Sequence, residues 1–145
     1  MSVLGHWRLD QFTLSFSDRR PSRSPFDDGF LFYGSNGTMQ ACLSKKIRSA
    51  FSQKGLERGH NGHEAEKSQC FDEYLSYAGR YQIQQNQVIH HVELSLNPTI
   101  IGTKLKRFYR LEGKQLILFY DDPQPSGLCC HYELIWSPAH AVLVS

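Results

Sequence analysis

Residues 88–98 read VIHHVELSLNP, and this stretch decides the fold. Its aliphatic side chains recur at every second position: Val88, Val92, Leu94 and Leu96. Such alternation predicts a β-strand that buries one face. His90 falls on the apolar face. The polar side chains of His91, Glu93 and Ser95 fall on the other face. A strand that carries an imidazole among its core residues either pairs it with nearby polar groups or uses it for function.

Seven further strand-like runs surround this stretch, and turn signals separate them. Together the predicted strands are residues 5–16, 30–33, 38–44, 80–85, 88–96, 104–111, 114–121 and 128–136. The inward parity changes between Leu9 and Phe12, which predicts a bulge in the first strand.

The second and third strands flank Asn36-Gly37, a strong hairpin signal. Both faces of this hairpin are apolar, so two choices of inward face remain open. The inward residues are either Phe30, Phe32, Ala41 and Leu43, or Leu31, Tyr33 and Cys42.

Two further hairpins predict which residues face one another. A turn at Asn86-Gln87 places Ile83 opposite His90 and Tyr81 opposite Val92. A turn at Glu112-Gly113 places Tyr109 opposite Leu116, Arg107 opposite Leu118 and Leu105 opposite Tyr120. Both registers bring mainly apolar residues together on one face, which supports antiparallel pairing.

Residues 66–78 form the one convincing helix in the sequence. Five side chains share an apolar face at helical spacing: Cys70, Phe71, Tyr74, Leu75 and Ala78. Gly79 follows as a stop signal. The polar residues 45–66 before it predict a long loop.

About eight antiparallel strands with sequential hairpins favour an all-β, up-and-down barrel with one short helix before the fourth strand. Closure of the barrel removes the exposed sheet edges. A β-sandwich is the structural alternative. The chain has 145 residues, and we expect residues 1–145 to form a single domain.

Composition excludes several classes of protein. The chain has 16 basic and 14 acidic residues, a net charge of +2 that is too balanced to favour nucleic acid. No apolar run approaches the roughly 18 residues of a membrane span, and the N-terminus lacks the pattern of a signal peptide. The four cysteines form no CxxC pair, which favours reduced thiols and a cytoplasmic location.

Several short motifs, in order along the chain, carry a resemblance to a known family. They are residues 5–9 (GHWRL), 34–39 (GSNGTM), 74–81 (YLSYAGRY), 88–93 (VIHHVE) with Ser95 and Asn97-Pro98, Gly102 followed by Arg107, and 111–113 (LEG). Through these residues the chain resembles the lipocalin-like domain family of small bacterial and fungal proteins, which are related by shape to the calycin barrels. The resemblance implies an eight-stranded barrel with an internal cavity, but no single activity. Some members sit among enzymes of small-molecule biosynthesis.

Arg107 is the anomaly on the predicted inner face. No Asp or Glu shares the inward parity of the strands from residue 80 to residue 136, and a buried guanidinium is rarely left unpaired. Three explanations remain open: it reaches water near the rim, it pairs with a carboxylate from elsewhere, or it holds an anionic or carbonyl group of a ligand. The carboxylates considered are Asp10, Asp72 and Glu73.

His90 is either a neutral core histidine or a polar anchor in the cavity, where it can also act as a general acid or base beside Arg107. The expected ligand-binding residues are His90, Arg107, Tyr81, Tyr109, Tyr132 and Trp136. No metal site is expected, because adjacent strand residues such as His90 and His91 face opposite sides. No cofactor is expected, because the sequence has no phosphate loop and no dinucleotide-binding fingerprint.

We therefore expect the barrel to bind a small, largely hydrophobic molecule with an acidic or carbonyl group, as a ligand carrier or sensor. One alternative is a cofactor-free isomerase, cyclase or dehydratase that acts on a biosynthetic intermediate in the same cavity, with His90 and Arg107 as catalytic residues. Another is an interaction protein whose barrel is filled with side chains. A monomer or homodimer is expected, with no nucleic-acid or membrane partner.

Overall fold

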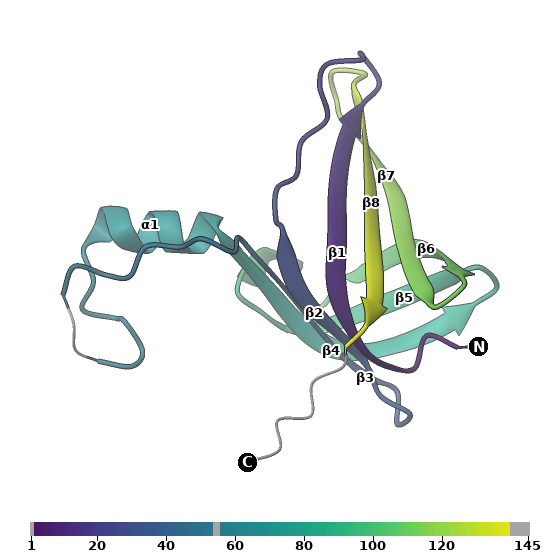
Figure 1. The fold of residues 1–145 in the computed structure, drawn as a ribbon, viewed down its shortest axis with the longest axis horizontal. Helices are drawn as coiled ribbons and strands as arrows, with labels where there is room; N and C mark the ends of the chain where they lie inside the picture. The colour runs from purple at the N-terminus through teal and green to yellow at the C-terminus, as the bar shows by residue number, and fades with distance from the viewer. Residues whose placement is uncertain (1, 54–55, 140–145) are drawn as a thin grey trace.

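The computed structural model describes residues 2–53 and 56–139, and these form a closed barrel of eight antiparallel strands (Figure 1). The strands follow one another around the barrel in sequence order, and the first pairs with the last. They are β1 (Gly5–Phe16), β2 (Asp28–Tyr33), β3 (Thr38–Ser44), β4 (Tyr74–Gln84), β5 (Gln87–Ser95), β6 (Lys104–Glu112), β7 (Gln115–Pro123) and β8 (Cys129–Pro138). The predicted up-and-down barrel is confirmed, and the sandwich alternative is wrong.

The helix prediction is right in kind but wrong in extent. Helix α1 (Glu64–Asp72) does precede the fourth strand, yet residues 74–78 belong to β4. Leu75 and Tyr77 pair with Leu43 and Ala41 of β3 and pack against the core. Ladder pairing and burial therefore override the helical spacing in this segment. No side chain of α1 is buried, and the helix projects from the side of the barrel (Figure 1).

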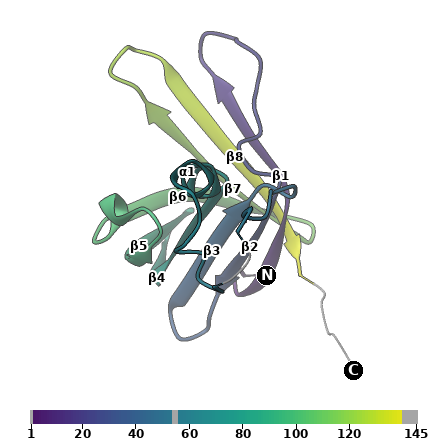
Figure 2. The ribbon, with the colours of Figure 1, turned by 90° about the vertical axis from the view of Figure 1, so that its left-hand side faces the viewer.

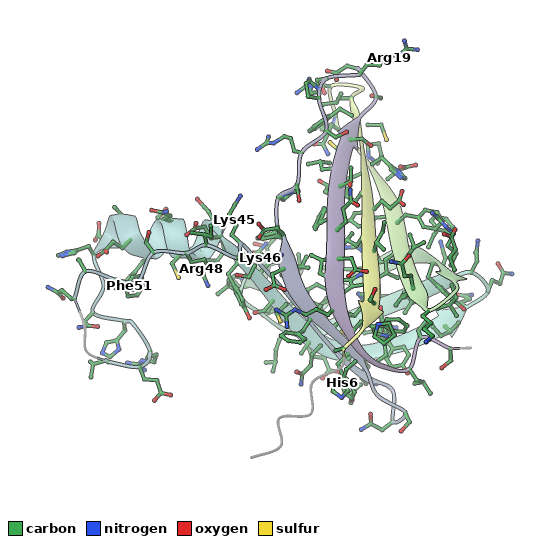
Figure 3. All side chains as sticks on the ribbon, in the orientation of Figure 1. His6, Arg19, Lys45, Lys46, Arg48 and Phe51 are labelled. Atoms are coloured by element: carbon green, nitrogen blue, oxygen red, sulfur yellow. The ribbon has the colours of Figure 1, made fainter. Side chains whose placement is uncertain are left out.

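The segment between β3 and α1 is held to the helix by polar contacts. The Glu66 carboxylate accepts hydrogen bonds from the Ser52 amide and hydroxyl, at 2.8 and 2.9 Å. Arg48 donates to the Cys70 carbonyl oxygen at 2.9 Å. Figure 3 shows Lys45, Lys46 and Arg48 along this segment as it leaves the barrel for α1.

The β2–β3 hairpin buries a combination of residues that neither sequence choice contained. Leu31 and Tyr33 point inward from β2, and they pair with Ala41 and Met39 of β3. A four-residue turn, Gly34–Gly37, fixes this register, because the Gly34 amide donates to the Thr38 carbonyl oxygen at 2.8 Å. The outer face of the hairpin is also apolar, so the sequence pattern does not determine which face points inward.

The other two predicted registers are wrong by two residues. Gln84 pairs with Gln87, so Tyr81 faces His90 and Ile83 faces Val88. Glu112 pairs with Gln115, so Tyr109 faces Leu118. Gln85 and Gly113 take the first turn position with positive φ angles of 58° and 59°. A shift of two residues leaves every side chain on its predicted face.

Two bulges adjust the faces of the barrel. The predicted bulge of β1 is confirmed, since its register with β8 shifts between Leu9 and Gln11. A second bulge lies where β4 meets β5: Gly79 pairs with Val92, but Ala78 pairs with Leu94. Beyond this bulge the faces are exchanged, so the prediction that Leu94 points inward is wrong. Leu94 is 71% exposed.

One end of the barrel is filled by buried side chains, among them Trp7, Leu9, Met39, Leu116 and Trp136. The Trp7 indole N–H donates to the Val3 carbonyl oxygen at 2.8 Å and ties the N-terminal segment to this end. The strands diverge toward the opposite end, where β1, β7 and β8 lean away from β3, β4 and β5 (Figure 2).

Candidate functional site

A cavity of about 530 Å³ lies inside the barrel beyond the filled end. Strand residues of β1–β8 form its wall. It is also bordered by residues outside the barrel strands: Pro25, Phe26, Phe71, Asp72, Leu96, Asn97 and Ile100. Its size lies within the range of small-molecule sites, which argues against the alternative of a barrel completely filled with side chains.

The cavity brings together four of the six predicted site residues. His90, Arg107, Tyr132 and Trp136 line it. Tyr81 and Tyr109 also pack against the core, but they lie outside the lining. The Tyr81 hydroxyl donates to the Gly34 carbonyl oxygen at 2.8 Å, and its ring packs against the Tyr33 ring.

His90 is buried, with 1% of its surface exposed, and both of its ring nitrogens are occupied. Nε2 lies 2.6 Å from the Tyr33 hydroxyl, and Nδ1 lies 2.7 Å from the Tyr77 hydroxyl. Burial lowers the pKa of His90 to about 3, and the nearby Arg107 charge adds to this effect. The imidazole is therefore neutral at physiological pH and bridges two phenols.

Arg107 lies diagonally across from His90, because Val88 pairs with Arg107 while His90 pairs with Leu105. Its guanidinium lies 3.6 Å from the centre of the Tyr120 ring, and Tyr120 stacks on Tyr132 with ring centres 4.6 Å apart. The side chain is half-buried, and one NH donates to the Lys106 carbonyl oxygen at 3.2 Å.

Arg107 forms no ion pair with any carboxylate in the part of the chain that the structure describes. Pairing with Asp10, Asp72 or Glu73, one of the three sequence explanations, is not found. Asp10 instead accepts hydrogen bonds from Gln115 and Ser137. The guanidinium thus faces the cavity with a cation–π contact and one backbone hydrogen bond.

The tyrosines around the cavity are neutral hydrogen-bonding groups. Burial raises the pKa of Tyr77 to about 12 and the pKa of Tyr33 well above its usual value. Burial also raises the pKa of Tyr120 and Tyr132. The Arg107 charge opposes each of these shifts without reversing it, so the phenols keep their protons.

Sequence reasoning missed three phenols of this site. The helical spacing predicts Tyr77 within the helix, and Tyr33 belongs to only one of the two possible inward faces of the β2–β3 hairpin. Tyr120 lies on the predicted inward face but is not among the predicted site residues. The signal that was available is the alternation of Leu75, Tyr77 and Tyr81 at even spacing, which is typical of a strand.

Ser95 also lines the cavity, although the sequence pattern placed it on the outer face. The bulge opposite Gly79 causes this correction, because it turns Ser95 inward as it turns Leu94 outward. Trp136 is 2% exposed, and its indole N–H has no acceptor among the described residues.

A second hollow, of about 870 Å³, lies against β2–β5, and some residues, among them Tyr77 and Ser95, line both this hollow and the inner cavity. Its lining includes the exposed side chains of Phe30, Leu94, Leu96 and Ile101. It is larger than the inner cavity, but its lining residues include none of Asp, Glu, Lys or Arg. The inner cavity joins a cation to a neutral imidazole and several phenols, and it is therefore the candidate site.

Within residues 2–53 and 56–139, no group of three or more His, Cys, Asp or Glu side chains is placed to hold a metal ion. No helix in these residues is long and apolar enough to cross a membrane.

Comparison with known proteins relates the chain to a family. The sequence model described as the lipocalin-like domain matches residues 4–137, which include every residue of the cavity wall named above. No curated protein matches the chain.

Proposed function

Because this chain belongs to the lipocalin-like domain family, we propose that its barrel binds a small, largely apolar molecule that carries an acidic or carbonyl group. The protein then acts as a carrier or sensor of that ligand. Most of the wall is aliphatic or aromatic, as in sites that enclose hydrophobic molecules.

The observation that supports this proposal is the position of Arg107. A guanidinium that leaves water without a carboxylate partner loses hydration that the protein does not fully replace. A ligand carboxylate or carbonyl oxygen replaces it through charge-assisted hydrogen bonds. Arg107 is half-buried against Tyr120 and has no ion-pair partner among the described residues.

His90 is less suited to the enzymatic alternative than the sequence suggests. A general acid or base needs a ring nitrogen within reach of the substrate and a pKa near the working pH. Both nitrogens of His90 contact protein hydroxyls, and its pKa is lowered to about 3. We therefore propose ligand binding in preference to a cofactor-free isomerase, cyclase or dehydratase. The cytoplasmic location expected from the thiols stays a prediction.

The test compares two fluorescent probes with a shared aromatic skeleton: 8-anilinonaphthalene-1-sulfonate, an anion, and neutral N-phenyl-1-naphthylamine. We expect the wild type to bind both. Arg107→Leu should weaken binding of the sulfonate by about tenfold, which corresponds to the loss of one charge-assisted hydrogen-bonded contact. Binding of the neutral probe should change by less than about twofold, because the apolar wall is kept.

The matched control is Lys106→Leu, which removes a positive charge from the exposed neighbouring position of β6. It should leave the ratio of the two affinities unchanged. Failure of the wild type to bind either probe would overturn the proposed function. Equal weakening of both probes by Arg107→Leu would show that Arg107 supports the fold and does not anchor an anion.

A further inference from the structure

The hydrogen bonds from Tyr33 through His90 to Tyr77 have a defined direction. Tyr33 is 1% exposed, and its hydroxyl has one hydrogen-bond partner among the described residues, Nε2 of His90. A buried hydroxyl that donates to nothing loses the full value of its hydration. Tyr33 is therefore the donor, and Nε2 is the acceptor.

A neutral imidazole carries one proton, so an accepting Nε2 places the N–H on Nδ1. Nδ1 lies 2.7 Å from the Tyr77 oxygen and donates to it. The Tyr77 oxygen is then occupied as an acceptor of the imidazole proton. Its own O–H is left to donate, and Tyr77 lines the cavity.

The opposite direction is less favourable. If Tyr77 donated to Nδ1, the proton on Nε2 would point at the Tyr33 oxygen, and the Tyr33 O–H would need another acceptor in the filled end of the barrel. The structure gives it none among the described residues. The first direction leaves its free donor in the cavity, where a ligand can accept from it, and so avoids an orphaned donor in the core.

From this geometry, and on the basis of the proposed function, we propose that Tyr77 donates a hydrogen bond to the ligand and that Tyr33, acting through His90, is the positioning residue that fixes this direction. With Arg107 the cavity then presents two donors of different kinds, one neutral and one cationic. The ligand class that fits is a molecule with a ketone, aldehyde or carboxylate oxygen. An alcohol fits less well, because its own proton would need an acceptor beside these donors.

The first test needs no ligand and uses the wild-type protein. Nitrogen-15 NMR of the histidine side chains distinguishes a protonated ring nitrogen from an unprotonated one. We expect the His90 signals to show a protonated Nδ1 and an unprotonated Nε2. Tyr33→Phe removes the hydrogen bond from the Tyr33 hydroxyl to Nε2. The His90 signals should then shift toward a mixture of the two tautomers. A protonated Nε2 in the wild type would overturn the inference and leave the proposed function standing.

The second test uses 6-propionyl-2-(dimethylamino)naphthalene, a neutral aryl ketone whose emission shifts to the blue when its carbonyl loses a hydrogen bond. Tyr77→Phe should weaken its binding about fivefold to tenfold and shift its bound emission to the blue. Binding of N-phenyl-1-naphthylamine, which has no carbonyl group, should stay within about twofold. Tyr33→Phe should weaken ketone binding by a smaller factor, although Tyr33 lies outside the cavity lining.

The matched control is Thr38→Val, which removes a hydroxyl hydrogen bond in the β2–β3 hairpin with little change of shape. It should not change the ratio of ketone to naphthylamine affinity. If the wild type binds neither probe, the proposed function fails together with the inference. If both probes bind and Tyr77→Phe weakens them equally, or weakens neither, the inference alone is overturned.

Discussion

Gly79→Ala is expected to destabilise the barrel by about 4 kcal/mol or more, which is a large part of the free energy of unfolding of a typical domain. A Cβ atom at Gly79 would lie 1.9 Å from the His91 carbonyl oxygen and 3.0 Å from the Glu93 amide nitrogen. Both are backbone atoms of β5 at the bulge, so they can move only if the β4–β5 ladder opens. The same bulge turns Ser95 into the cavity, and its loss would disturb the site as well as the fold.

The free energy of unfolding of both proteins, obtained from urea titrations followed by circular dichroism, checks this prediction. The control is Gly113→Ala, whose Cβ would meet no atom within 4 Å but whose φ of 59° is unfavourable for alanine. That cost is about 1–2 kcal/mol. If Gly79→Ala lowers the free energy of unfolding no more than Gly113→Ala does, then β4 and β5 do not approach as closely at the bulge as the distances from Gly79 indicate.

The second large effect is a loss of stability in acid that comes from His90. The pKa of this imidazole is about 3 in the folded state and 6.5 in the unfolded chain. Between these values the unfolded state binds a proton that the folded state does not. The free energy of unfolding therefore falls as the pH falls through this range, by about 1.4 kcal/mol per pH unit from this residue. The loss by pH 5 amounts to about 2 kcal/mol.

Urea unfolding of the wild type and of His90→Gln, over about pH 7.5 to pH 5, measures this contribution. Glutamine keeps a donor and an acceptor near the two tyrosines but does not titrate. We expect the variant to be less stable than the wild type at neutral pH and to show a shallower loss of stability in acid. The two proteins differ only at residue 90, so the difference between their stability curves isolates the contribution of His90. Parallel curves would mean that His90 accepts a proton in the folded state.

The sequence predicted which side chains of β5–β8 point inward better than it predicted which residues pair across the hairpins. Both hairpin registers are wrong by two residues, yet His90, Arg107 and Tyr132 still point inward, because side chains alternate with a period of two. Arg107 was recognisable as an anomaly from parity alone, since no carboxylate shares its face in the neighbouring strands.

Other features had an ambiguous sequence signal or none. Residues 74–78 carry apolar side chains toward the core and toward the second hollow, so their pattern fits a helix as well as a strand. The bulge at Gly79 exchanges the faces of Leu94 and Ser95 without a distinctive residue in β5. The contacts of His90 with Tyr33 and Tyr77 join β5 to β2 and β4, and such contacts follow from barrel closure and not from local pattern.

The central claim is that Arg107 anchors the polar group of an apolar ligand inside the barrel. Its most direct test is a titration of nitrogen-15-labelled protein with decanoate and, separately, with decanol, following the arginine Nε–Hε signals by NMR. The Arg107 signal is identified by its absence in Arg107→Leu. We predict that decanoate shifts this signal, that decanol shifts it less, and that the Arg8 signal, ion-paired with Asp28 at 2.7 Å, stays in place. An Arg107 signal that is unmoved by decanoate, or moved equally by decanol, would contradict the account.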